Sequence, residues 1–176
     1  EDRGFGIGLV VGAITLGSGD DTYLAAKSVG NYRTLYKTVR SDPRLQRIHE
    51  LYPMIAIWDD HEFSDDCHGA TATYLDGKVD ETDTQRRKDA ERVFFEFMPT
   101  EIGLGAEDTL EVTDAVLWPN TRIYDRFRFG ANCEIFLTDA RTHRPDHLVP
   151  EDGFPGRIVM DEATREQEEE AASRGW

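Results

Sequence analysis

The sequence predicts a mixed α/β fold. Apolar residues recur at helical spacing in three segments, a continuous apolar run of strand length lies between two of them, and two shorter runs flank a turn. A strand that is apolar along its whole length is buried on both faces, as between layers of helices or between stacked sheets. The 176 residues, of which 39% are hydrophobic, are enough for one compact domain with its own core.

The charge of the chain restricts its partners. Lys and Arg number 20 against 35 Asp and Glu, which gives a formal net charge of −15 and argues against generic binding to nucleic acids or anionic lipid. The longest apolar stretch, residues 5–16, falls short of the ~20 residues of a membrane-spanning helix, so no transmembrane segment is expected. Cys67 and Cys133 leave the redox compartment open, and Cys133 is expected in the core because it lies in a predicted strand.

The first half of the chain predicts a short strand or loop followed by two helices. Residues 5–16 are apolar and interrupted by glycines, which favours the strand or loop. An apolar stripe over residues 32–39 predicts a helix with Asn31 as its N-cap. Asp42 and the proline after it stop that helix and begin a second one. The buried side of the second helix is expected to contain Leu45, Ile48 and Leu51.

The second half predicts a buried strand, a third helix and a hairpin. Residues 52–58 form the continuous apolar run. Capping signals at residues 82–85 and an apolar stripe that ends before Pro99 predict the helix. Alternating residues around a Gly-Ala-Asn turn predict a β-hairpin over residues 123–137. Residues 161–173 are helix-prone but polar on all sides, which is typical of a solvated helix or a frayed end.

Four consecutive residues that can bind a cation directly follow the predicted buried strand: Asp59, Asp60, His61 and Glu62. Open α/β sheets bind ligands at such strand ends, and several carboxylates with a histidine are typical of sites that hold metal ions against a phosphate ester. Residues 59–83 contain nine acidic residues and one Lys, so a solvated acidic loop in which His61 only forms hydrogen bonds is the alternative. Arg141 and Arg144, just after the hairpin, could clamp a phosphate or pair with these carboxylates.

The sequence WDDHE at residues 58–62 is the most specific motif of the chain. Together with NYRTLY at 31–36, SDPRLQ at 41–46 and LTDAR at 137–141, in this order, it resembles the PhoD-like alkaline phosphatase family of metallophosphatases over residues 28–160. The resemblance implies a calcineurin-like fold, here part of a sandwich of two mixed β-sheets flanked by helices. It also implies an exported protein, periplasmic or extracellular.

The resemblance implies a role for each residue of the motif. Asp60 is the best candidate metal ligand and Asp59 the second. His61 would contact the phosphate and assist the leaving group, whereas Glu62 would orient His61 or a metal-bound water. Beside these motif residues, Arg141 and Arg144 are the candidates for binding the substrate phosphate, with ion pairs to the carboxylates as the alternative.

The resemblance also implies Ca²⁺ and Fe³⁺ as cofactors and hydrolysis of phosphate mono- or diesters by a metal-bound hydroxide. The family's upstream and downstream metal motifs are not matched here. We therefore expect residues 1–176 to be the central fragment of one such domain, to lack part of the site and to be inactive alone. The alternative is a non-catalytic acidic module that binds calcium through residues 59–83, although the spacing of an EF-hand is missing.

Overall fold

A computed structural model describes residues 11–16, 19, 22–73, 80–98, 100 and 112–145 of the chain. The helix predicted at 161–173 lies outside these ranges. Every element named below belongs to the compact unit Glu1–Arg144. No helix within the described ranges combines the length and the apolar character that crossing a membrane requires.

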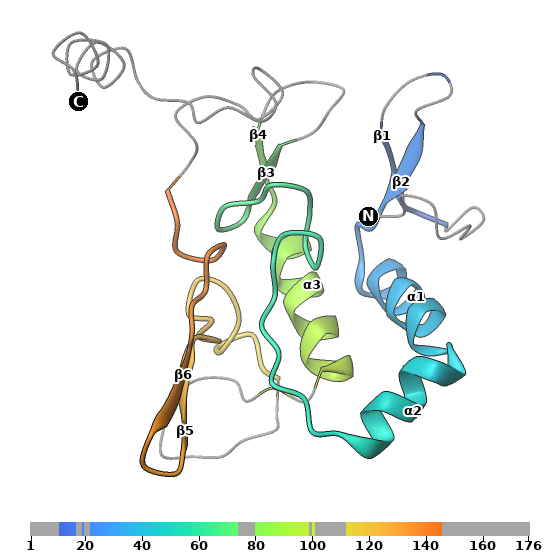
Figure 1. The fold of residues 1–176 in the computed structure, drawn as a ribbon. Helices are drawn as coiled ribbons and strands as arrows, with labels where there is room; N and C mark the ends of the chain where they lie inside the picture. Colours follow the sequence, from blue (N-terminus) through green and yellow to red (C-terminus); the bar gives the residue numbers. More distant parts are fainter. Residues whose placement is uncertain are drawn as a thin grey trace, which may run out of the picture. The chain divides into compact units, whose positions relative to one another are not determined.

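The described residues form nine elements, which follow one another in chain order (Figure 1). They are β1 (Ile14–Leu16), β2 (Tyr23–Ala25), α1 (Val29–Arg40), α2 (Pro43–Leu51), β3 (Thr71–Thr73), β4 (Asp80–Thr82), α3 (Thr84–Phe97), β5 (Asp125–Phe129) and β6 (Cys133–Leu137). Each strand pairs in antiparallel fashion with its neighbour in sequence: β1 with β2, β3 with β4 and β5 with β6. The described sheets are therefore three local hairpins.

The mixed α/β class is confirmed, but the expected sandwich is not formed by the described residues. They contain three helices and two-stranded sheets only. A sandwich needs strands that pair across long stretches of sequence, whereas the pairs here close over short connections. The helices α1 and α3 lie side by side and pack against one another (Figure 1).

Helix α1 forms where the apolar stripe predicts it, but its N-cap is Ser28 rather than Asn31. The Ser28 side chain accepts a hydrogen bond from the backbone N–H of Asn31, and the Asn31 Oδ1 accepts from the N–H of Lys27 at 3.1 Å. Asn31 thus lies in the first turn, and its side chain reaches back to the N–H of the residue before the N-cap, one residue beyond the N–H that a capping box uses. The prediction of Asn31 as N-cap is wrong because Ser28, three residues earlier, is the N-cap and accepts from the N–H of Asn31 itself.

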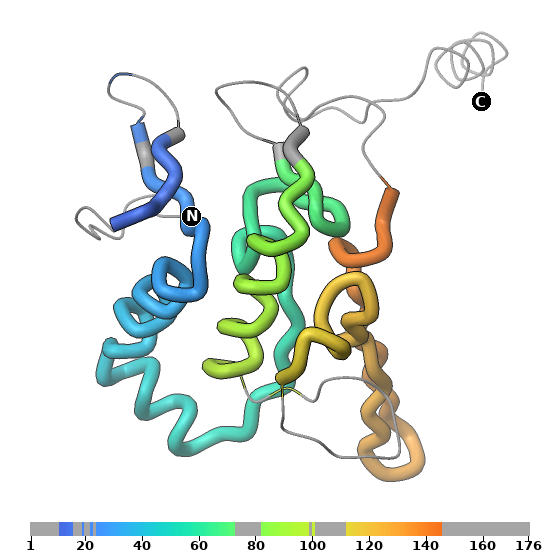
Figure 2. Tube along the Cα trace, turned by 180° about the vertical axis from the view of Figure 1, so that it is seen from behind, coloured from blue at the N-terminus to red at the C-terminus, as the bar shows by residue number. Residues whose placement is uncertain are grey.

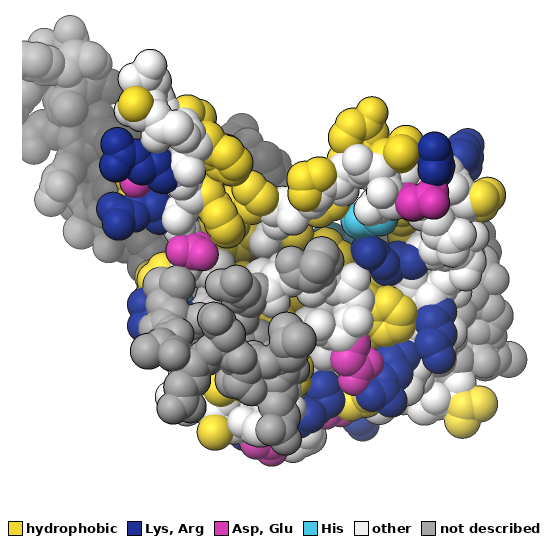
Figure 3. Space-filling model, turned by 90° about the horizontal axis from the view of Figure 1, so that it is seen from below, with side chains coloured by type: hydrophobic (Ala, Val, Ile, Leu, Met, Phe, Trp, Pro, Cys, Tyr) yellow, Lys and Arg dark blue, Asp and Glu magenta, His cyan; other side chains and the backbone are white. Residues whose placement is uncertain are grey.

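Helix α2 begins as predicted, since Asp42 is its N-cap and accepts a hydrogen bond from the N–H of Arg44 at 2.8 Å. The predicted buried side is wrong. Leu45 is half-buried, whereas the side chains of Ile48 and Leu51 are exposed. Among the described elements α2 packs against α1, and no described residue buries Ile48 or Leu51. Figure 3 shows apolar side chains on the surface of the face seen from below.

The prediction of a buried strand at residues 52–58 is also wrong. Residues 53–59 are neither helix nor strand, and Met54 and Ile55 are exposed. No described strand pairs with this segment, so it has no ladder of hydrogen bonds and no layer covers its two faces. Figure 2 shows it running beside α3, and its last residue, Trp58, is buried against Phe94 of that helix.

Helix α3 confirms the prediction of a third helix. Asp83 is its N-cap, with a side chain that accepts from the N–H of Arg86 at 2.9 Å, and the helix ends at Phe97. Its apolar side packs into the core, where Tyr32 of α1 and Phe63 also lie. The buried apolar residues of this main core are Ala25, Ala26, Tyr32, Phe63, Cys67, Ala72, Ala90 and Val93.

The predicted hairpin is confirmed as β5 and β6, joined through Gly130, whose φ of +66° suits a tight turn. Cys133 pairs with Phe129 in this hairpin but is exposed, so its expected place in the core is wrong. The hairpin is an isolated two-stranded sheet, and most of its side chains stay accessible to solvent on both faces.

Candidate metal centre

The acidic loop, defined here as residues 59–68, begins where Trp58 anchors the chain against α3. A tight turn follows, since the carbonyl oxygen of Asp60 accepts hydrogen bonds from the N–H groups of Phe63 at 2.9 Å and Ser64 at 2.8 Å. Phe63 then enters the core, where the Tyr32 hydroxyl donates to its carbonyl oxygen at 2.8 Å. The loop is therefore held at both ends of its turn by buried aromatic side chains.

The Asp60 carboxylate stabilises this turn by accepting hydrogen bonds from backbone N–H groups. Its Oδ1 accepts from the N–H of His61 at 2.8 Å, and its Oδ2 accepts from the N–H of Asp66 at 3.0 Å. Asp66 has a φ of +47°, a conformation that costs a non-glycine residue roughly 1–2 kcal/mol. These contacts fix the direction of the Asp60 side chain before any ligand binds.

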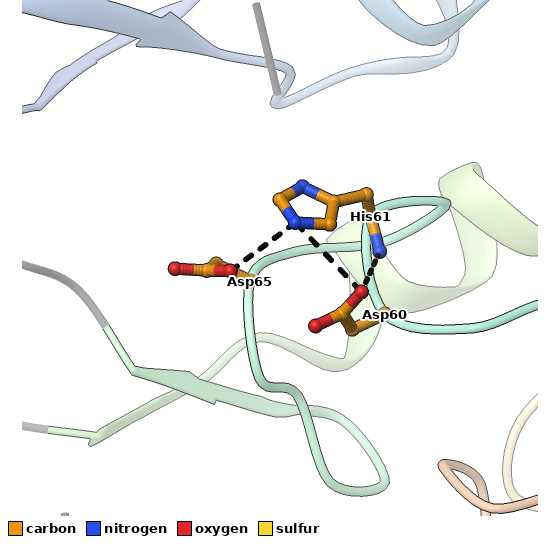
Figure 4. Close-up of side chains that lie close together, drawn as sticks. All are labelled: Asp60, His61 and Asp65. Atoms are coloured by element: carbon orange, nitrogen blue, oxygen red, sulfur yellow. Dashed lines mark hydrogen bonds and ion pairs between the residues drawn. The ribbon is translucent and has the colours of Figure 1, made fainter. Parts of the chain in front are cut away.

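Three side chains of the acidic loop converge on one point (Figure 4). The His61 Nε2 lies 3.3 Å from Asp65 Oδ1 and 3.8 Å from Asp60 Oδ1. One potential ligand atom from each residue lies within 4.8 Å of the other two. Asp60 and Asp65 are largely buried, while half of the His61 side chain is exposed, so the cluster opens on its histidine side.

The two other predicted motif residues lie outside this cluster. The Asp59 side chain is 74% exposed and turns toward Arg141, with its Oδ1 at 2.7 Å from the Arg141 Nε. The Glu62 Oε2 accepts from the backbone N–H of Asp59 at 2.9 Å. Glu62 therefore stabilises the first residue of the loop, and both predicted roles stay predictions.

The two predicted arginines lie against the acidic loop. Arg141 contacts Asp66 Oδ1 at 3.0 Å and Asp60 Oδ2 at 3.4 Å in addition to Asp59, and Arg144 contacts Asp66 Oδ1 at 2.6 Å. Burial would lower the pKa of Arg141, but the surrounding carboxylates outweigh burial and raise it, so the guanidinium stays charged. In the structure, Arg141 and Arg144 therefore form ion pairs with the carboxylates of the loop, which is the alternative to binding a phosphate.

The residues of the cluster fit a bound cation. Burial would raise the pKa of Asp60, but the N–H of Asp66 and the charge of Arg141 lower it overall, so this carboxylate is ionised at neutral pH. Three aspartates of the loop pair with two arginines and the fourth, Asp65, lies beside His61, which leaves excess negative charge. Two carboxylates and an imidazole suit a transition metal such as iron, whereas carboxylate oxygens alone suit Ca²⁺.

The sequence did not single out three important residues: Asp65, Asp66 and Asp139. Asp65 lies one helical turn after His61, a spacing that places two side chains of a turn on the same side. Asp139 lies 81 positions after Trp58, and nothing in the local sequence pattern connects the two. In the structure, the Asp139 Oδ1 accepts a hydrogen bond from the indole N–H of Trp58 at 3.1 Å. Only the fold brings these two residues together.

A cluster of carboxylates and a histidine on a loop between buried aromatic anchors defines a mixed α/β protein with a potential metal-binding centre. The family model of the PhoD-like phosphatases matches residues 16–175. The chain therefore belongs to the PhoD-like phosphatase family, as the WDDHE motif predicts. Neither a curated protein nor a solved structure matches the chain significantly.

Proposed function

We propose that the protein is a metal-dependent phosphoric ester hydrolase whose cation is held by Asp60, His61 and Asp65. The observation that carries this proposal is the convergence of these three side chains in a chain of the PhoD-like phosphatase family. A bound cation would act as a Lewis acid, offset the charge of the phosphate and lower the pKa of a water. Ca²⁺ and Fe³⁺ are the ions that the family resemblance implies.

The residues of the chain have separate tasks in this proposal. Asp60 supplies carboxylate oxygens that backbone hydrogen bonds of the turn hold in place, and Asp65 supplies an oxygen 3.3 Å from the His61 Nε2. The Nε2 of His61 faces the two carboxylates and would bind the cation, so its other ring nitrogen, which points away from them (Figure 4), is the atom proposed to reach a phosphate oxygen or the leaving group. Glu62 holds the backbone of Asp59 and so supports the start of the loop.

Arg141 and Arg144 are proposed to bind the substrate phosphate. A guanidinium has five N–H donors in one plane, and phosphate oxygens can accept two of them at once. Both arginines lie within hydrogen-bond distance of the same loop that carries the cluster. A phosphate bound at the cluster could therefore replace a carboxylate as the acceptor of one of these N–H donors.

Calorimetric titration with Ca²⁺ and with Fe³⁺, followed by hydrolysis of p-nitrophenyl phosphate, tests this proposal. Asp65→Asn removes one charged ligand atom and should weaken binding of the preferred ion at least tenfold. Asp114→Asn is the matched control, because Asp114 pairs with Arg92 away from the cluster and its change should leave binding unaltered. Equal affinity in all three proteins would contradict the site.

Hydrolysis separates the enzyme from the alternative calcium-binding module. We expect the ester to be cleaved only when the ion is present, and a chelator to stop the reaction. The resemblance predicts that a longer chain is needed for turnover, so this chain and a longer one are compared. Tight Ca²⁺ binding without hydrolysis in either chain would favour the module. An exported location also remains a proposal.

A further inference from the structure

A buried ion pair lies behind the acidic loop. Within α3, the Arg87 Nε donates to the Glu91 Oε1 at 2.7 Å, and the two side chains are only 2% and 1% exposed. The Glu91 Oε2 accepts from the Thr121 hydroxyl at 2.7 Å and from the N–H of Trp118 at 2.8 Å. The guanidinium of Arg87 also lies over the ring of Trp58, 4.8 Å from its centre.

This ion pair is connected to the predicted phosphate-binding arginine. The second amino group of Arg87 donates to the Thr142 hydroxyl at 3.0 Å, and the N–H of Thr142 donates to Asp139 Oδ1 at 2.8 Å. The same oxygen of Asp139 accepts from the Trp58 indole N–H at 3.1 Å and from the N–H of Arg141 at 3.0 Å. One carboxylate oxygen thus joins the residue before the acidic loop to the backbone of Arg141.

A buried ion pair adds little to stability by itself, because removing two charges from water offsets most of their attraction. Its value lies in directed hydrogen bonds, which allow one arrangement and exclude others. Here these bonds reach two segments far apart in sequence, the one ending at Trp58 and the one holding Asp139 and Thr142. Both segments lead directly into the residues of the candidate metal centre.

We infer that Thr142 and Asp139 are positioning residues, through which the buried pair Arg87–Glu91 sets the place of Arg141 on the acidic loop. The phosphate-binding part of this inference rests on the proposed function. The placement of Arg141 does not, because it is a property of the folded chain that can be measured without a substrate. Thr142 is 2% exposed, so its hydroxyl acts through Arg87 rather than on a ligand in solution.

Two variants of the same chemistry separate positioning from general stability. Thr142→Val removes the acceptor of Arg87 on the side of Arg141, whereas Thr121→Val removes a donor to Glu91 on the opposite side of the pair. Both lose one buried hydroxyl from the same network. We expect similar losses of thermal stability, but only Thr142→Val should disturb the contacts of Asp139.

The readout is the indole N–H resonance of Trp58 in a ¹H–¹⁵N spectrum, assigned by its loss in Trp58→Phe. It should move by more than its line width in Thr142→Val and in Asp139→Asn, stay in place in Thr121→Val, and return in Thr142→Ser, which keeps the hydroxyl. If Thr142→Val does not fold, the position of the Trp58 resonance in Asp139→Asn and in Thr142→Ser decides the inference. A resonance that moves equally in both valine variants, or in neither, overturns the inference.

Binding of inorganic phosphate in the presence of Ca²⁺ then tests the link to function. Thr142→Val should weaken it roughly three- to tenfold, the effect of one hydrogen bond, while Thr121→Val leaves it unchanged. If the unaltered protein binds no phosphate, the proposed function fails, and the Trp58 resonance still decides whether Thr142 positions Asp139, whose same oxygen accepts from the N–H of Arg141. Equal phosphate affinities of the two variants would contradict the link.

Discussion

Two partly buried aspartates depend on hydrogen bonds for their charge. Burial would raise the pKa of Asp139, but hydrogen bonds from Thr142, from the N–H of Arg141 and from the Trp58 indole lower it overall. Its second oxygen, Oδ2, is buried and accepts no hydrogen bond from the described residues. The pKa of Asp60 is lowered in the same way by Asp66 and Arg141, which outweigh burial. Both side chains therefore stabilise the fold as anions.

The direction of these shifts predicts an acid-sensitive stability. A carboxylate whose pKa is lowered by folding contributes fully above its unfolded pKa, about 3.9, and loses this contribution as the pH falls through the folded pKa. Asp139→Asn should lower the Tm by roughly 3–10 °C at neutral pH. The difference from the unaltered protein should persist down to about pH 5, begin to shrink near the unfolded pKa of about 3.9, and vanish only below the folded pKa, which is lower. Thermal unfolding across this range measures it, and a difference that grows on acidification would contradict the assignment.

The two cysteines should differ sharply in reactivity. Burial raises the pKa of the Cys67 thiol to about 11, although Arg87 and Arg141 oppose the rise, whereas Cys133 is exposed. At a pH of about 8, only ~0.1% of a thiol with this pKa is thiolate, the reactive form. Iodoacetamide should thus alkylate Cys133 rapidly and Cys67 only in denaturant, as mass spectrometry of the peptides would show. Rapid alkylation of Cys67 in the folded protein would contradict its burial.

At the scale of elements, the turn after the acidic loop depends on a glycine. Gly69 has a φ of +54°, its N–H donates to the carbonyl oxygen of Arg141 at 2.9 Å, and a Cβ there would lie 2.8 Å from the Trp118 ring. The backbone must pass close to this ring to reach Arg141. Any side chain at this position would push the two apart.

Alanine substitutions at two glycines test this contact. Gly130 in the β5–β6 turn has a φ of +66° but no atom near a Cβ, so Gly130→Ala should cost only the left-handed conformation, about 1–2 kcal/mol. Gly69→Ala should cost ~1–3 kcal/mol more, because the ring of Trp118 must move as well. Urea unfolding measures both free energies. Equal losses would show that the ring is free to move away.

Element boundaries and element burial were not equally predictable. The start of α2 follows from Asp42 and Pro43, because capping is decided by a few neighbouring atoms. The burial of Ile48 and Leu51 depends on what covers them, and no described element does. The prediction of a strand at residues 52–58 is wrong for the same reason, because a strand forms only when another strand pairs with it, and no described strand does.

At the scale of the whole molecule, a bound cation should stabilise a chain with a net charge of −15. A ligand that binds only the folded state at 100 times its Kd adds about 2.7 kcal/mol, or roughly 5–10 °C in Tm for a domain of this size. NaCl of equal ionic strength should raise the Tm less, because it only screens the repulsion between the negative charges of the chain. Scanning calorimetry with the ion, with NaCl and with a chelator compares the three conditions.

Scanning calorimetry of two variants also shows where the stabilising cation binds. Asp65→Asn should abolish the rise in Tm that the ion produces beyond that of NaCl, whereas Asp114→Asn should keep it. A rise that persists in Asp65→Asn would place the cation elsewhere on the acidic surface.

The sequence by itself determined the family, the three described helices, the β5–β6 hairpin and the candidate site at the WDDHE motif. These depend on local patterns of neighbouring residues, which a sequence displays directly. Only the tertiary structure decided that Asp65 joins Asp60 and His61, and that Arg87, Asp139 and Trp58 meet behind them. Such contacts connect residues up to 81 positions apart, and which of them form depends on the packing of the whole chain rather than on any local preference.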